Sequence, residues 1–200
     1  MSNLDLTIVV PTYNLGHYLP ETLKSIQQQT IDFELWLIDD ASTDGTAQTV
    51  ADFVKGIPNF HATGFNHQRG IGAARNFGID HATGQAVAFV DGDDLIAPTF
   101  AETLSHGFTS GVVATAVGYD WWHRNRGGPN RFQLLSQPEM FDQVSRHGSV
   151  VGGYIWNKAF SRDALTVGFI RSSVLLRLAA DYYFTAALVA LLPGTHDYNT

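Results

Sequence analysis

The chain has 200 residues, 44% of them hydrophobic, which is enough for one sizeable core, so we predict a single domain over residues 1–200. Its formal net charge of -7 argues against nucleic-acid binding, which normally depends on basic patches. Cysteine is absent, which excludes a disulfide framework and thiol chemistry and fits a cytoplasmic protein.

Several stretches are predicted to be buried strands, because small, apolar and β-branched residues run through them without polar alternation. They are residues 6–10, 33–38, 57–63, 86–90 and 112–117, of which the third is the weakest. Helix patterns separate these strands. We therefore predict an α/β fold of Rossmann-like type, with right-handed βαβ units and a mostly parallel central sheet flanked by helices.

Helices are predicted in the intervals between the strands. The first begins near Pro20, the second follows the turn at residues 39–45, and the third spans residues 70–82. Another follows Pro98 and runs to about residue 108. The apolar residues at helical spacing should face the core: Leu19, Leu23 and Ile26, then Val50, Phe53 and Val54, then Ile71, Ala74 and Ile79.

The pattern changes after Gly118. Residues 119–130 mix aromatic, basic and turn residues, which predicts a loop or irregular hairpin on the rim of the sheet. Aromatic rings beside polar donors suit a sugar, but exposed tryptophans also mark protein contacts, and both interpretations stay open. Residues 172–192 are predicted to form one long amphipathic helix that carries Asp181.

Acidic residues end the strand at residues 86–90. In an open α/β sheet, ligands collect beyond the carboxyl ends of the strands. Asp91 and Asp93, separated by Gly92, can turn two oxygen donors towards one point, which suits Mg²⁺ or Mn²⁺ shared with a substrate phosphate. The alternative is a solvated acidic turn that caps the helix near Pro98.

Polar residues follow other strands at the same predicted edge: Pro11-Thr-Tyr-Asn14, Asp39-Asp-Ala-Ser42 and the stretch at residues 66–78. A planar base could pack against Tyr13, Asp40 could accept its imide N–H, and Arg75 could bind carbonyls or phosphate. Taken singly, these residues could equally be a turn aromatic, a helix cap and a surface ion pair. Their coincidence at the ends of several strands favours a ligand site.

Four motifs resemble, in order and spacing, the successive signatures of the family 2 glycosyltransferases, which have the GT-A fold. They are Thr7-Ile-Val-Val-Pro-Thr-Tyr-Asn14, Leu37-Ile-Asp-Asp-Ala-Ser-Thr-Asp-Gly-Thr46, Gly72-Ala-Ala-Arg-Asn-Phe-Gly78 and Phe89-Val-Asp-Gly-Asp-Asp94. Two shorter matches follow. Gly152-Gly-Tyr-Ile-Trp-Asn-Lys158 is similar to a segment of bacterial members, and Asp181 resembles the second acid of the family's Glu-Asp pair.

The resemblance implies a bacterial, non-processive transferase that moves a sugar from a nucleotide-sugar, usually a UDP-sugar, to a saccharide or lipid-linked acceptor, as in surface polysaccharide synthesis, with inversion. Residues 1–118 would bind the donor, and residues 119–200 would form a smaller, irregular acceptor side. Asp181 would be the catalytic base, and Asp93 and Asp91 would bind a Mn²⁺ or Mg²⁺ cofactor. The implied substrate-binding residues are Pro11, Thr12, Tyr13, Asn14, Asp40, Arg75, Asp91, Gly92, Trp156 and Lys158.

Three departures from the family pattern affect this prediction. Ala180 replaces the acid that usually precedes the base, and no Gln-x-x-Arg-Trp sequence occurs, which argues against a processive polymerase. The chain ends at Thr200, whereas many relatives continue with helices that cover the acceptor or touch the membrane. We therefore expect a C-terminally truncated domain, whose missing part would make a peripheral contact with the inner face of the membrane.

Two other functions stay open. A phosphatase of the haloacid dehalogenase type would use Asp91 as an aspartyl nucleophile and Asp93 as a second acid with Mg²⁺. Such enzymes usually carry this motif on the first strand, and here it follows the fourth. A non-catalytic nucleotide- or protein-binding domain would account for Ala180 and for the short chain.

Overall fold

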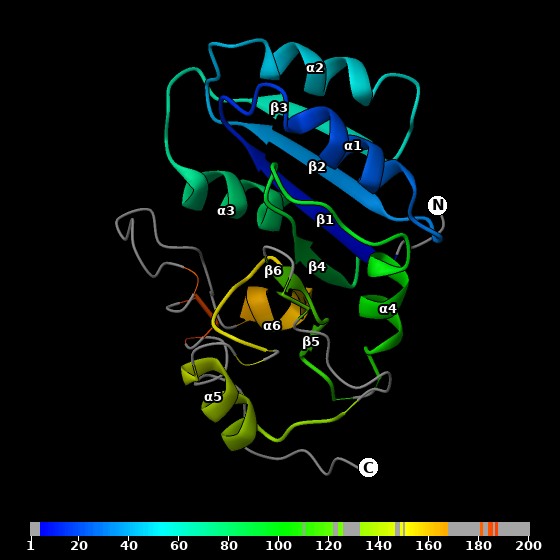
Figure 1. The fold of residues 1–200 in the computed structure, drawn as a ribbon, viewed down its shortest axis with the longest axis vertical. Helices are drawn as coiled ribbons and strands as arrows, with labels where there is room; N and C mark the ends of the chain where they lie inside the picture. The colour runs from blue at the N-terminus through cyan, green and yellow to red at the C-terminus, as the bar shows by residue number, and fades with distance from the viewer. Residues whose placement is uncertain are drawn as a thin grey trace.

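The computed structural model describes residues 5–109, 111–121, 124–125, 133–146, 149, 151–167, 181, 184–185 and 187. Within them, the strands of the central sheet are β1 (Leu6–Thr12), β2 (Glu34–Asp39), β3 (Phe60–Gly64), β4 (Ala86–Phe89), β5 (Ala114–Ala116) and β8 (Lys158–Ser161). Their order across the sheet is β3-β2-β1-β4-β8-β5 (Figure 1). The predicted α/β class is confirmed.

The sheet brings several strand ends to a common edge. β1 pairs in parallel with β2 and β4, and β2 pairs in parallel with β3. β8 runs antiparallel between β4 and β5, with Ala88 opposite Ala159 and Ala116 opposite Lys158. The ends of β1, β2, β4 and β5 and the start of β8 therefore lie together, and we call this the carboxyl edge.

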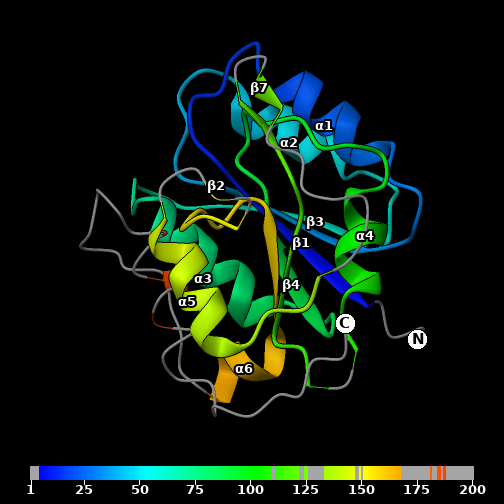
Figure 2. The ribbon, with the colours of Figure 1, turned by 60° about the horizontal axis from the view of Figure 1, so that its bottom comes forward.

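Helices cover both faces of the sheet. They are α1 (Leu19–Gln27), α2 (Thr46–Phe53), α3 (Ile71–His81), α4 (Phe100–His106) and α6 (Arg162–Val167). α5 (Gln137–Ser145) instead packs through Val144 against Val151. Because successive side chains of a strand point to opposite faces, Ile8 and Val10 pack towards α1, α2 and α4, whereas Val9 packs towards α3 and α6. Figures 1 and 2 show these two helix layers on either side of the sheet.

The third predicted helix needs one correction. Ala74 and Ile79 of α3 are buried as predicted, but Ile71 is 46% exposed. Ile71 is the first residue of α3, and the Gly70 N–H just before it bonds to Asp40 beyond the end of β2. The helix thus starts past the strand ends, so no strand lies beneath the side chain of Ile71.

The second half departs further from the predictions. β5 is shorter than the predicted strand, and the irregular hairpin is present as β6 (Asp120–Trp121) paired antiparallel with β7 (Arg124–Asn125). The sequence patterns did not predict α5, β8 or α6. In α5 the carboxylate of Glu139 accepts the Ser136 N–H at 2.7 Å, and this Ser-x-x-Glu capping box is a sequence signal for the helix start.

Most of the long helix predicted at residues 172–192 lies outside the described residues. Residues 181, 184, 185 and 187 are helical. Phe184 is fully buried, and its ring contacts those of Phe89 and Phe160, so the segment that carries Asp181 is anchored to β4 and β8. Across the residues that the structure describes, no helix combines the length and hydropathy needed to cross a membrane.

Candidate active site

The loops after β1 and β2 are joined by hydrogen bonds at the carboxyl edge. The Asn14 N–H donates to Ser42 Oγ at 2.9 Å, and Asn14 Oδ1 accepts the Thr43 N–H at 2.8 Å. Asn14 has a positive φ of 48°, a conformation that its short polar side chain tolerates. Tyr13, just before Asn14, is 42% exposed and lies on the rim of the site.

Two neighbouring acids at the end of β2 have partners inside the protein. Asp39 is buried and accepts hydrogen bonds from the Thr12 hydroxyl at 3.2 Å and the Ser42 N–H at 2.9 Å. Asp40 is also buried, and its two oxygens accept the N–H groups of Arg69 (2.6 Å) and Gly70 (2.8 Å). Asp40 therefore fixes the loop before α3. Its contact with a nucleobase stays a prediction, for which each oxygen has a second lone pair.

Arg75 connects two acids that lie far apart in the sequence. Its side chain is 2% exposed, with Nη1 2.5 Å from Asp181 Oδ1 and Nη2 3.0 Å from Asp91 Oδ1. One guanidinium thus holds the predicted catalytic base and a predicted metal ligand. Contact of Arg75 with the nucleotide stays a prediction, and the alternative of a surface ion pair is wrong because the guanidinium is buried.

The acids that follow β4 repel one another. Burial raises the pKa of Asp91 against the lowering effect of the Arg75 guanidinium, and the charge of Asp181 raises this pKa further. Burial, together with the charges of Asp91 and Asp93, raises the pKa of Asp94 to about 6. A cation bound beside these carboxylates would relieve the repulsion.

The turn between Asp91 and Asp93 fits a divalent cation by its donor chemistry. Gly92 allows the turn to pack against β1, because a Cβ there would lie 2.4 Å from Leu15 Cδ1 and 3.0 Å from the Pro11 carbonyl oxygen. Asp93 is exposed. Among the described residues, no group of three or more His, Cys, Asp or Glu could hold a metal. The geometry therefore suits a cation that takes further ligands from phosphates and water.

Trp156 and Lys158 lie at the carboxyl edge in different surroundings. Trp156 is half-buried, and its ring stacks on that of Tyr154. Lys158 is fully buried, and its ammonium donates to the carbonyl oxygens of Val151 and Tyr154 and to Asn157 Oδ1. All three N–H bonds of Lys158 are used inside the protein. The predicted direct contact with a substrate does not fit this geometry, because the ammonium holds the preceding loop instead.

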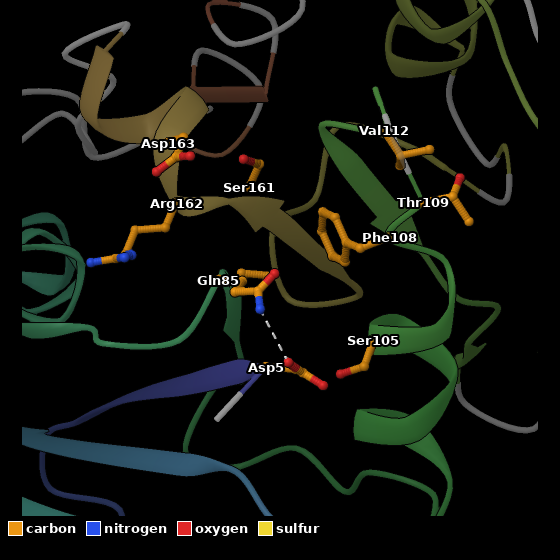
Figure 3. Close-up of a pocket in the computed structure, with 10 residues that line it drawn as sticks. Asp5, Gln85, Ser105, Phe108, Thr109, Val112, Ser161, Arg162 and Asp163 are labelled. Atoms are coloured by element: carbon orange, nitrogen blue, oxygen red, sulfur yellow. Dashed lines mark hydrogen bonds between the residues drawn. The ribbon is translucent and has the colours of Figure 1, made fainter. Parts of the chain in front are cut away.

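A separate pocket of about 560 Å³ lies at the opposite edge of the sheet (Figure 3). Asp5 and Gln85, which precede β1 and β4, line it and are joined by a hydrogen bond of 3.3 Å. Arg162 and Asp163 at the start of α6 also line it. None of the predicted site residues that the structure describes lines this pocket, so it is distinct from the candidate active site.

Comparison with known sequences identifies the class of protein. The glycosyl transferase family 2 profile matches residues 7–169, which include the loops described above. The chain belongs to this family, which agrees with the resemblance of its four motifs.

Individual relatives extend well beyond the matched region. The minor teichoic acid biosynthesis protein GgaB of Bacillus subtilis (strain 168) is 35% identical over 107 residues, which are 52% of this chain and 12% of GgaB. S. aureus TarS 1-349, solved in complex with UDP-GlcNAc, superposes with a TM-score of 0.71 at 24% identity over 93% of this chain and 53% of that chain.

A second solved structure also shares the fold. The mannosyltransferase PcManGT from Pyrobaculum calidifontis, in complex with GDP-Man and Mn²⁺, superposes with a TM-score of 0.64 at 22% identity over 92% of this chain and 51% of that chain. These superpositions confirm the GT-A fold. The chain spans about half or less of the length of all three proteins.

The sequence patterns predicted no role for two residues at the carboxyl edge, Asp94 and Tyr154. Asp94 adds a third carboxylate beside Asp91 and Asp93, and its position in the Asp-Gly-Asp-Asp stretch was the available signal. Tyr154 stacks on Trp156 with ring centroids 5.2 Å apart. Tyr154 precedes Trp156 by two residues, a spacing that places both side chains on one side of an extended chain. The stacking itself depends on the fold of the loop.

Proposed function

We propose that this domain transfers a sugar from a nucleotide-sugar to a hydroxyl of a saccharide or lipid-linked acceptor, with inversion at the anomeric carbon. The observation that carries the proposal is the position of the buried Arg75 guanidinium, which binds both Asp91 and Asp181. One acid suits the donor's cation, and the other suits deprotonation of an acceptor. A single side chain holds both acids at the carboxyl edge, so a base for the acceptor hydroxyl would lie near the donor's cation.

The nucleotide of the donor is proposed to bind over the ends of β1 and β2. Tyr13 is exposed there and offers an aromatic face to the base. Asp40 has lone pairs left to accept an imide N–H while it holds the loop before α3. Thr12 supports this surface through its bond to Asp39 at the end of β2, and Asn14 through its bond to Thr43 in the following loop.

A Mn²⁺ or Mg²⁺ ion is proposed to bind Asp93 and Asp91, whose carboxylates match its preference for oxygen ligands. When bound, such an ion neutralises the negative charge that develops on a departing diphosphate. Arg75 supplies positive charge to the same region, because its Nη2 lies 3.0 Å from Asp91. The Mn²⁺ complex of PcManGT supports this assignment.

Asp181 is proposed to be the catalytic base. The acceptor oxygen would form a bond to the anomeric carbon while the bond from that carbon to the diphosphate breaks. The nucleoside diphosphate would leave with the electron pair, and the hydroxyl proton would pass to Asp181. Among the described residues, the hydrogen bonds of Asp181 use Oδ1, so Arg75 orients the carboxylate and leaves Oδ2 to the hydroxyl.

The relatives suggest which substrates to test first. TarS was solved with UDP-GlcNAc, and GgaB is named for teichoic acid biosynthesis. We therefore propose a UDP-sugar such as UDP-GlcNAc as the donor and a cell-surface polymer or its lipid-linked precursor as the acceptor. A cytoplasmic location is proposed for the domain, in line with its cysteine-free sequence. The phosphatase alternative is not favoured, because the chain belongs to a glycosyltransferase family.

Release of nucleoside diphosphate tests the proposal. The protein would be incubated with UDP-GlcNAc, UDP-glucose, UDP-galactose or GDP-mannose, each with Mn²⁺ or with EDTA and with water as the default acceptor. We expect metal-dependent release from at least one donor, at a rate about 10²–10⁴-fold lower in Asp181→Asn. Asp32→Asn, which alters an exposed acid before β2, is the matched control and should keep the rate. The proposal would be contradicted if no donor released its nucleoside diphosphate while p-nitrophenyl phosphate released phosphate in a reaction that depends on Asp91.

A further inference from the structure

Three aromatic rings from two separate segments meet beside β8. The rings of Tyr154 and Trp156 are stacked, with centroids 5.2 Å apart and an interplanar angle of 25°. The ring of Tyr119 stands edge-on to Trp156 at 4.8 Å and to Tyr154 at 6.1 Å. All three side chains are half-buried rather than part of the core. We call this group the aromatic cluster.

The aromatic cluster lies at the carboxyl edge. Tyr119 follows the end of β5, and Trp156 precedes the start of β8, where Ala116 is opposite Lys158. β8 also pairs with β4, whose end leads directly into Asp91. The cluster therefore occupies the side of the site that is opposite the loops of β1 and β2, where the nucleotide is proposed to bind.

Asn157 and Lys158 tie together the two segments that carry the rings. Asn157 Nδ2 donates to the Val117 carbonyl oxygen at 2.9 Å, and the Val117 N–H donates to the Asn157 carbonyl oxygen at 3.0 Å. The Lys158 ammonium donates hydrogen bonds to the carbonyl oxygens of Val151 and Tyr154 and to Asn157 Oδ1, the last at 2.7 Å. Together these bonds fix the loop from residue 151 to residue 157 relative to residue 117.

The same loop is joined to the segment of the proposed base. The Thr185 hydroxyl, four residues after Asp181 in the sequence, donates to the Gly153 carbonyl oxygen at 3.3 Å. Burial lowers the pKa of the Lys158 ammonium to about 7, and the negative charge of Asp181 acts in the opposite direction. The aromatic cluster and Asp181 are thus parts of one connected structure.

A purely structural role would not require a charged group at this position. An apolar side chain of similar length could fill the same volume without the cost of removing an ammonium from water. Replacing buried ions by apolar side chains often leaves the stability of a protein unchanged or raises it. The ammonium instead provides three directed bonds to one loop. Such bonds are useful where the exact positions of the ring-bearing residues matter.

We propose that Asn157 and Lys158 are positioning residues that hold Tyr119, Tyr154 and Trp156 as a platform for a pyranose ring of the substrate. The inference rests on the proposed glycosyl transfer. The apolar face of a pyranose packs on an aromatic ring, and polar groups at the edge orient its hydroxyls. The ring can belong to the donor sugar or to the acceptor, and the two sources are distinguished by experiment.

Whether the platform binds the donor sugar is tested by titration calorimetry in the presence of Mn²⁺. The Kd values of UDP and UDP-GlcNAc are measured for the wild type and for Trp156→Ala. If the platform receives the donor sugar, the Kd of UDP-GlcNAc rises about tenfold while the Kd of UDP stays within twofold. Trp156→Phe, which keeps a ring, should restore most of the affinity. If the platform receives the acceptor, both nucleotides bind Trp156→Ala as they bind the wild type.

Whether the platform binds the acceptor is tested by ligand-observed NMR. N-acetylglucosamine, cellobiose and methyl β-glucoside are added to the protein saturated with UDP and Mn²⁺, and their binding is measured. Binding of at least one saccharide should weaken about fivefold or more in Trp156→Ala. Asn157→Ala and Lys158→Met should weaken the binding of whichever ligand Trp156→Ala affects, UDP-GlcNAc or a saccharide. Lys24→Met, which changes an exposed lysine of α1, should leave both affinities unchanged. Thermal unfolding of each variant checks that it is folded.

The inference is overturned if Trp156→Ala binds UDP-GlcNAc and every saccharide as the wild type does, including the case in which the wild type binds no saccharide. It is also overturned if Lys158→Met lowers stability but leaves all these affinities unchanged. Failure of the proposed function has a different outcome, because the wild type would then bind neither UDP nor UDP-GlcNAc.

Discussion

The Nη1 atom of Arg75 lies 2.5 Å from Oδ1 of Asp181, although 106 residues separate them along the chain. The same guanidinium reaches Asp91 on its other side, at 3.0 Å. Asp181 and the acidic turn after β4 are therefore linked through a side chain of α3. This arrangement makes Arg75 the residue whose removal should disturb the donor side and the acceptor side together.

Arg75→Ala should lower both stability and activity. Removing one partner of a fully buried ion pair costs about 3–5 kcal/mol, and we expect about 2–3 kcal/mol here because the side chains of Asp91 and Asp181 are 28% and 23% exposed. Arg75→Lys should restore little, because one ammonium cannot reach both acids as a planar fork does. Urea unfolding and the rate of UDP release would measure the two effects.

The matched control for Arg75 is Arg146→Ala on α5. Arg146 forms an exposed ion pair with Asp142, so its removal should change the free energy of unfolding by less than about 0.5 kcal/mol. An Arg75→Ala protein with the stability and the UDP release of the wild type would show that the two ion pairs do not organise the site.

Gly92→Ala should distort the acidic turn. The added Cβ would lie 2.4 Å from Leu15 Cδ1 and 3.0 Å from the Pro11 carbonyl oxygen, so the turn must shift away from β1. We expect a loss of about 1–3 kcal/mol in the free energy of unfolding and weaker Mn²⁺ binding. Gly64→Ala is the stability control, because its Cβ would meet Asp39 at an ordinary 3.7 Å. Equal stability of the two variants would contradict the close packing of Gly92.

Mn²⁺ affinity should rise with pH. Burial and the charges of Asp91 and Asp93 raise the pKa of Asp94 to about 6, and burial raises the pKa of Asp91. Below pH 6 protons therefore compete with the cation, and we expect affinity to increase about tenfold between pH 5 and pH 7 and to level off above. Asp94→Asn should make this dependence shallower. Calorimetric titration with Mn²⁺ at pH 5, 6, 7 and 8 measures it, and a flat profile in the wild type would refute it.

Lys158 should make stability depend on pH in the alkaline range. Burial lowers its pKa from 10.5 in the unfolded chain to about 7 in the folded protein, so between these values the unfolded state binds more protons. The free energy of unfolding of the wild type, relative to Lys158→Met, should therefore rise with pH by up to about 1.4 kcal/mol per unit from pH 7 to pH 10. Urea unfolding of both proteins measures the difference, and a difference constant with pH would mean that Lys158 stays charged.

The first half of the fold was predictable because its signals are local. The strand at residues 6–10 is a continuous apolar run, and the apolar residues of α1 recur at helical spacing. Both patterns survive in the structure as buried faces. Ile71 fits the apolar pattern of α3 as well as Ala74 and Ile79 do, but it lies beyond the ends of the strands. The spacing of apolar residues does not show where the sheet beneath a helix ends.

The rest depends on tertiary contacts that no local pattern carries. β8 is a strand of four residues that begins with a fully buried lysine, so its composition resembles a loop. Two of the three partners of Lys158 are backbone carbonyl oxygens of the preceding loop, which no side-chain pattern reveals. Likewise, the motif that contains Arg75 places it near a ligand but does not show that its partners are Asp91 and Asp181.

The most direct test of the central claim is the binding of UDP-GlcNAc with and without Mn²⁺, measured by calorimetry on the wild type, Asp93→Asn and Asp32→Asn. We predict that the wild type and Asp32→Asn bind the donor at least tenfold more tightly with Mn²⁺ than with EDTA, and that Asp93→Asn loses this difference. Equal Mn²⁺-dependent affinity in Asp93→Asn and the wild type would contradict a nucleotide-sugar site built on the acids after β4.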